Sequence, residues 1–195
     1  MILLLMAALL LATPVNTSAE LFAVPFMGVK FGGGTSIVDL EFAADKTTFT
    51  LGGAIMDLDD GLLGYEASFG YVLGYFEKGG TLPLVATGSF VIDGTVSAIF
   101  AVPPRLTGYG LRPYAQVGAG LVHAQAADWL NVFQVRRTVP VITAGVGAVG
   151  MFTNNVGLRF DVRHLRSLTS DDGSLRTVGR RISFSRFTIG LYLRL

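Results

Sequence analysis

The chain has 195 residues, enough for one domain, and only 15% of them are charged, with a formal net charge of +1. Ordinary globular proteins carry about 25% charged residues, so this chain has too few charges for a surface that faces water everywhere. It also lacks the concentrated basic face that nucleic-acid binding requires, so no nucleic-acid partner is expected. Because the sequence contains no cysteine, disulfides and thiolate metal sites are excluded.

The first 19 residues have the layout of a secretory signal. An apolar core from Ile2 to Ala12 is followed by the small residues Thr17, Ser18 and Ala19. This core is too short for a membrane-spanning helix, and a buried helix is the alternative interpretation. We therefore expect residues 1–19 to be a signal peptide and residues 20–195 to form a single mature domain.

The mature part predicts strands rather than helices. Glycine makes up 25 of the 195 residues, which disfavours helices, and eight segments show the two-residue alternation of β-strands. These segments are 21–32, 48–58, 62–75, 90–102, 112–124, 141–152, 156–168 and 187–195. The connections between them are alternately longer and shorter, which is typical of outer-membrane barrels. The predicted fold class is therefore all-β, an eight-stranded antiparallel up-and-down transmembrane β-barrel.

Segment 156–168 shows most clearly which face of the predicted strands is apolar. Val156, Leu158, Phe160 and Val162 share one face, and the residues between them are Gly157, Arg159, Asp161 and Arg163. A water-soluble barrel of the lipocalin kind would also alternate, but its outer face would be rich in Lys and Glu. We therefore expect the apolar face to contact lipid and the polar face to line a narrow lumen.

Four segments, 25–28, 63–71, 112–120 and 156–163, resemble the recurring strands of small bacterial outer-membrane β-barrel proteins, the family of OmpA, OmpX and OmpW types. The resemblance extends over essentially the whole mature chain. It implies a location in the outer membrane of a Gram-negative-type bacterium, with outer-membrane lipid as a partner. Thr188, Gly190, Leu193 and Leu195 are similar to the signal by which the barrel-assembly machinery recognises such proteins, although the commonest form ends in Phe.

The strand parity places a set of charged residues inside the barrel, where isolated charges are costly and should pair. We expect Glu66 to meet Arg159 or Arg194, and Asp93 or Asp161 to meet Arg163, Lys30 or Arg186. A water-filled path that favours anions is the alternative. The predicted lumen network is Lys30, Glu66, Asp93, Arg159, Asp161, Arg163, Arg186 and Arg194.

Two further patterns are candidates for a cofactor site or a catalytic site. Residues 145–150 read G-x-G-x-x-G, but a dinucleotide site needs a helix to begin there, whereas this segment reads as a strand, so no cofactor is expected. His123 and His164 have outward parity, as interfacial residues do. A lipid-modifying enzyme could use them with Asp128, Ser167 or Asp172, although no spacing selects these partners.

The segment 128–137 is the most unusual predicted loop. Trp129, Leu130 and Phe133 are large apolar residues on a loop, which indicates an interaction surface, a lid or packing over the barrel mouth. Arg136 and Arg137 could contact anionic lipid headgroups.

The sequence predicts the fold more sharply than the role. We expect an integral outer-membrane barrel with a structural, surface-interaction or envelope-integrity role and no catalysis. An OmpW-like narrow channel or transporter for small or hydrophobic solutes is the first alternative, and a lipid-modifying enzyme is the second.

Overall fold

The computed structural model describes residues 20–35, 47–58, 60–74, 90–107, 110–127, 134–168 and 182–195. The predicted signal peptide, residues 1–19, lies outside this part of the chain. A 3-10 helix, η1 (Pro104–Leu106), follows the fourth strand, and no helix in the described ranges is long and apolar enough to cross a membrane. The strands are β1 (Leu21–Thr35), β2 (Thr48–Asp57), β3 (Leu63–Leu73), β4 (Phe90–Ala101), β5 (Leu111–Ala127), β6 (Gln134–Met151), β7 (Val156–Ser167) and β8 (Ile182–Arg194).

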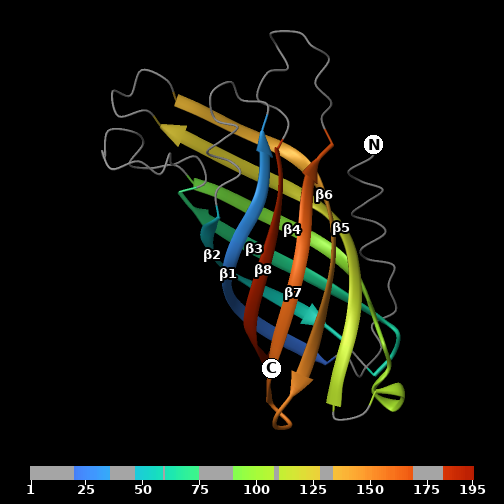
Figure 1. The fold of residues 1–195 in the computed structure, drawn as a ribbon. Helices are drawn as coiled ribbons and strands as arrows, with labels where there is room; N and C mark the ends of the chain where they lie inside the picture. Colours follow the sequence, from blue (N-terminus) through green and yellow to red (C-terminus); the bar gives the residue numbers. More distant parts are fainter. Residues whose placement is uncertain are drawn as a thin grey trace.

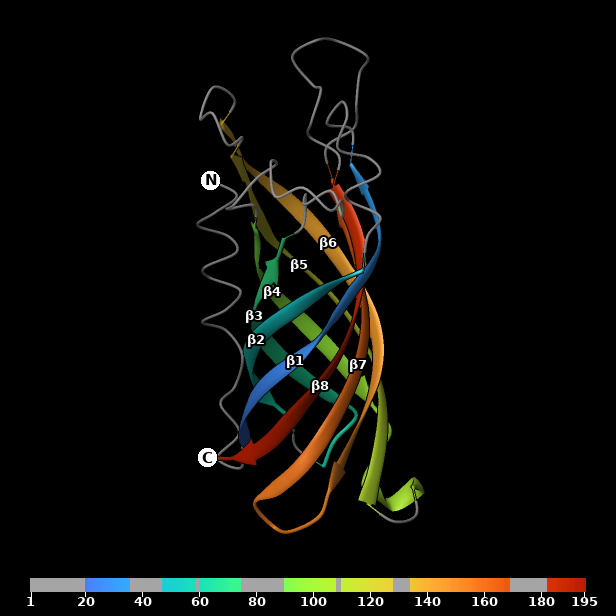
Figure 2. The same cartoon turned by 60° about the vertical axis from the view of Figure 1, so that its left-hand side comes forward.

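The eight strands form a closed antiparallel barrel in which each strand pairs with the next and β8 pairs with β1 (Figure 1). The rings of Phe22 in β1 and Tyr192 in β8 stack at 4.0 Å between centroids across this seam. The carboxyl terminus lies at the same end as η1 and the β6–β7 turn (Figure 2). The predicted eight-stranded up-and-down barrel is thus confirmed, with residues 60–62, η1 and residues 152–155 at one end.

Two strands begin well before the residue that the sequence predicted. β6 begins at Gln134 instead of residue 141, because the β5–β6 ladder continues to the pair Ala127–Gln134. Arg136 and Arg137 therefore belong to β6 and not to a loop. Likewise, β8 begins at Ile182 instead of residue 187. In both strands polar residues interrupt the apolar outer face, and this interruption concealed the continuing ladder.

The outer face of the barrel is apolar around its middle. β3 and β7 alternate exposed and buried residues along most of their length, as the sequence predicted. Large apolar side chains such as Val117 and Val146 are 54% and 60% exposed. A water-soluble barrel would not present such a surface, because exposed apolar side chains that form a contiguous belt need a non-aqueous partner.

The inside of the barrel has three layers. One apolar cluster fills the end near the 152–155 turn, and a second fills the opposite end. Buried polar and charged residues lie between them. The first cluster is Phe22, Val24, Ala54, Met56, Leu58, Ile99, Ala101, Tyr114, Val149 and Tyr192. The second is Val72, Val91, Val122, Ala124, Val139, Val141, Leu165, Ile182 and Phe184. The prediction that the polar face lines the lumen holds for the middle layer, but neither apolar cluster was predicted.

If the apolar belt contacts lipid, then Val117→Arg should destabilise the barrel by about 2–4 kcal/mol in lipid vesicles, because it places a charge on the lipid face. The free energy of unfolding is measured by urea titration. Phe152→Arg, in the exposed β6–β7 turn, is the control and should cost no more than about 1 kcal/mol. Equal stability of both variants and the wild type would contradict a lipid-facing belt.

Candidate functional site in the barrel lumen

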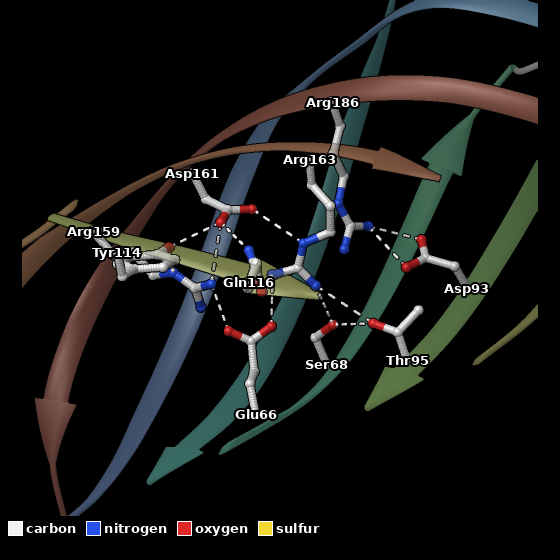
Figure 3. A network of polar contacts seen from close by, with 10 residues as sticks. All are labelled: Glu66, Ser68, Asp93, Thr95, Tyr114, Gln116, Arg159, Asp161, Arg163 and Arg186. Carbon is white, nitrogen blue, oxygen red and sulfur yellow. Dashed lines mark hydrogen bonds and ion pairs between the residues drawn. The ribbon is translucent and has the colours of Figure 1, made fainter. Parts of the chain in front are cut away.

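The polar layer of the lumen is built around β7. The sequence Arg159-Phe160-Asp161-Val162-Arg163 alternates, so its two arginines and its aspartate all point into the barrel while Phe160 and Val162 face outward. These three charged side chains are at most 3% exposed. They meet side chains from β3, β4 and β5, as Figure 3 shows. The layer therefore joins strands on opposite sides of the barrel.

Arg163 is the residue with the most partners. Its Nη2 donates to Glu66 Oε1 at 2.6 Å and to Gln116 Oε1 at 2.8 Å, while its Nη1 donates to Ser68 Oγ at 2.9 Å. A longer bond of 3.4 Å runs from Nη1 to Thr95 Oγ1, and Nε donates to Asp161 Oδ1 at 3.3 Å. The guanidinium is thus satisfied by groups on four strands.

Arg159 forms the second centre of the layer. Its Nη2 lies 2.5 Å from Glu66 Oε2 and 3.3 Å from Asp161 Oδ2. Its Nε donates to the Tyr114 hydroxyl at 2.6 Å, and this hydroxyl donates to Asp161 Oδ2 at 2.8 Å. Gln116 Nε2 also donates to Asp161 Oδ2. Glu66 and Asp161 therefore each bridge the two arginines, which compensates their buried charges.

A separate ion pair lies beside this group. Arg186 Nη1 donates to Asp93 Oδ1 and Oδ2 at 3.0 and 2.8 Å, and both side chains are almost completely buried. The guanidinium carbon of Arg186 also lies 5.3 Å from the centroid of the Phe26 ring. Gly70 faces this pair, and a Cβ there would collide with Arg186 Nη1 and Asp93 Oδ2. The glycine therefore provides the room that the pair occupies.

The structure brings together most of the charges that the sequence placed inside. Glu66 meets Arg159, Asp161 meets Arg163, and Asp93 meets Arg186, as three of the expected pairings state. Lys30 is fully buried on β1 beside Arg186. Arg194 differs from the expectation: it lies at the end of β8, 43% exposed, and pairs with Glu20 instead of Glu66. The reason is that the ladder ends there, so inward parity no longer means burial.

Four uncharged residues also belong to the layer, although the predicted network contained only charged residues. Strand alternation places each of them on the same face as a predicted lumen charge or an inward-facing glycine, so this alternation could have identified them. They are Ser68, Thr95, Tyr114 and Gln116.

The other candidate residues do not form a catalytic site among the described residues. His164 and Ser167 lie on opposite faces of β7. His164 Nδ1 is instead 2.9 Å from Ser185 Oγ, and His123 Nδ1 is 2.8 Å from Thr138 Oγ1. A nucleophile–base pair also needs a group that orients the histidine, and no carboxylate within the described ranges bonds to either ring. Asp128 and Asp172 lie outside the described residues.

The remaining sequence patterns are placed as follows. The G-x-G-x-x-G segment lies within β6, so no helix begins there to bind a pyrophosphate. No group of three or more potential metal ligands occurs in the described part of the chain. Trp129, Leu130 and Phe133 lie outside it, and Arg137 is exposed near the start of β6. In the C-terminal pattern, Thr188 and Gly190 are buried, Leu193 is half-buried and Leu195 is exposed.

A closed eight-stranded barrel with an apolar outer belt and a filled polar lumen has the architecture of small outer-membrane barrel proteins. Solved structures show the same fold: the chain is similar to Neisserial surface protein A, with a TM-score of 0.66 and 14% identity over 91% of this chain and 98% of that one. The sequence-based resemblance to small bacterial outer-membrane barrels is thereby confirmed at the level of the fold.

Two further solved structures agree. OprG, an outer membrane protein from Pseudomonas aeruginosa, gives a TM-score of 0.58 with 13% identity, over 91% of this chain and 96% of that one. Ail, the attachment invasion locus protein of Yersinia pestis, in complex with the heparin analogue sucrose octasulfate, gives 0.54 with 14% identity, over 91% and 99%. No protein-family model matches the chain, and no curated protein matches it either.

Charge reversal tests whether the polar layer stabilises the barrel. Glu66→Lys should lower the free energy of unfolding by at least about 3 kcal/mol, because it removes the shared carboxylate and adds a third buried cation beside Arg159 and Arg163. Thermal unfolding of the refolded barrel, followed by circular dichroism, measures this loss.

Glu20→Lys is the matched control, since it reverses the charge of a glutamate in an ion pair that is about 40% exposed. It should change stability by less than about 1 kcal/mol. If Glu66→Lys unfolds at the same temperature as the wild type, the buried ion pairs do not stabilise the fold.

Proposed function

We propose that this chain is an integral protein of the outer membrane of a Gram-negative-type bacterium, with a sealed lumen and a structural or surface-interaction role. The apolar belt supports contact with outer-membrane lipid. The likeness in fold to outer-membrane barrels supports the location. In this proposal the barrel itself neither transports solutes nor catalyses a reaction.

The sealed polar layer is the observation that carries the proposal. Arg163, Glu66 and Asp161 lie in the centre of the lumen at no more than 3% exposure, and their hydrogen bonds reach across it. The two apolar clusters cover this layer at both ends. A conducting lumen would instead need polar groups along a continuous water-filled path. The closed interior therefore favours the non-transporting role over the OmpW-like channel.

The role at the cell surface is proposed from the neighbours and from the loop end of the barrel. Two similar structures are named as a surface protein and as an attachment invasion locus protein. By analogy, the connections at the end opposite the 152–155 turn would supply the interaction surface, including Trp129, Leu130 and Phe133.

We also propose that the barrel-assembly machinery recognises β8 through Thr188, Gly190, Leu193 and Leu195. Support comes from the position of β8, which pairs with both β7 and β1 and so completes the barrel.

Planar-bilayer recording decides between the sealed barrel and the channel. The refolded mature chain should give no steady conductance steps, because the arginine–carboxylate layer leaves no continuous water path. Flotation of the protein with lipid vesicles serves as the control for insertion. Steady ion conductance by inserted protein would refute the sealed lumen and favour the channel.

A further inference from the structure

The outer face of β7 changes character before the strand ends. Its outward residues are apolar from Val156 to Val162, but the next two outward residues are His164 and Arg166, both exposed. Directly opposite on β8, His164 faces Ser185 and Arg166 faces Ser183. Four neighbouring outward positions are therefore polar, and we name these residues, His164, Arg166, Ser183 and Ser185, the β7–β8 polar patch.

The polar patch carries positive charge, and within the described ranges of β6, β7 and β8 no acidic side chain shares its outward face. β6 and β8 contain no Asp or Glu, and the one acidic residue of β7, Asp161, points into the lumen. A charge on the lipid face costs about 2–4 kcal/mol at the bilayer midplane but about 0–1 kcal/mol near the interface. The patch therefore fits the interfacial level at the end opposite the 152–155 turn, where lipid headgroups lie.

An apolar furrow begins immediately below this patch. It has a volume of about 610 Å³ and crosses β4 to β8 on the outer face. One row of cross-strand neighbours forms much of its wall, namely Phe100, Ala115, Val146, Val162 and Phe187.

The patch and the furrow are continuous. The pair Val162–Phe187 lines the furrow. The pair His164–Ser185 is the next outward pair on the same two strands, about 6.6 Å farther along them. The small side chain of Ala115 forms part of the floor between Phe100 and Val146. The polar patch therefore supplies a cationic, hydrogen-bonding end, and it adjoins an apolar furrow whose volume is in the usual range of ligand pockets.

We propose that this surface binds one phosphorylated lipid of the outer leaflet, with its phosphate on the β7–β8 polar patch and an acyl chain in the furrow. Arg166 supplies the charge-assisted hydrogen bonds that phosphate oxygens favour. His164 Nδ1 is 2.9 Å from the Ser185 hydroxyl, which orients the ring, and Nε2 can donate to the phosphate when it carries the proton. The inference rests on the proposed membrane location but adds a specific ligand site.

Native mass spectrometry of the refolded barrel in non-ionic detergent tests the site. Phosphatidic acid is the probe, and diacylglycerol with the same acyl chains is the control that lacks only the phosphate. Phosphatidic acid should bind with one saturable site and diacylglycerol at least about tenfold more weakly, since one charge-assisted contact is worth about that factor.

Two pairs of variants separate the two halves of the site. Arg166→Gln should weaken phosphatidic acid about tenfold, whereas Arg105→Gln, the same change at exposed η1, should not. Ala115→Trp should also weaken it by filling the furrow, whereas Ala67→Trp, on the outer face of β3, should leave it unchanged.

Circular dichroism of each variant in lipid vesicles verifies the membrane barrel before binding is measured. A barrel that folds in lipid yet binds both lipids equally, or loses as much affinity with Arg105→Gln as with Arg166→Gln, overturns the lipid site alone. Failure to fold in lipid would instead refute the membrane location.

Discussion

The closed ladder of backbone hydrogen bonds is the constraint on which the rest of this structure depends. A strand in hydrocarbon has to satisfy its N–H and C=O groups with other strands, because lipid offers no partners. Pairing of β8 with β1 meets this requirement for all eight strands. Once alternate residues such as Phe160 and Val162 face outward, the residues between them have to face inward whatever their charge. The charged lumen is thus a consequence of the apolar exterior.

The buried charges then determine how the interior is filled. Glu66 and Asp161 each contact both Arg159 and Arg163, so neither carboxylates nor guanidiniums are left isolated in a poorly hydrated space. The apolar clusters above and below this layer exclude water, which strengthens attraction between opposite charges. Together with the hydrogen bonds of Thr95, Tyr114 and Gln116, these contacts join β7 to β3, β4 and β5 across the barrel. The polar layer therefore both fills the lumen and connects strands on opposite sides of the barrel wall.

Much of this could be predicted from the sequence because the two-residue period is local. The alternation in β7 alone gave the faces of Arg159, Asp161 and Arg163, and hence their burial. Three features of the structure could not be predicted from this local alternation. The ladder extends to Gln134 where polar residues hide the period, the hydroxyl of Tyr114 joins the ion pairs, and Arg194 is exposed because its strand ends. Each depends on neighbours that are distant in the chain.

The separation in sequence between the partners of Arg163 constrains how the barrel enters the membrane. The guanidinium bonds to Glu66, which lies 97 residues earlier in the chain. Until β3 and β7 face each other, Asp161 is the one carboxylate beside Arg159 and Arg163, so one positive charge on β7 lacks the partner that Glu66 later supplies. A charge at the centre of a bilayer costs about 2.5–3.5 kcal/mol. One-by-one insertion of single strands is therefore unfavourable. Closure of the barrel and its insertion into lipid therefore have to proceed together, so that the charged side chains are kept out of the hydrocarbon until the barrel is closed.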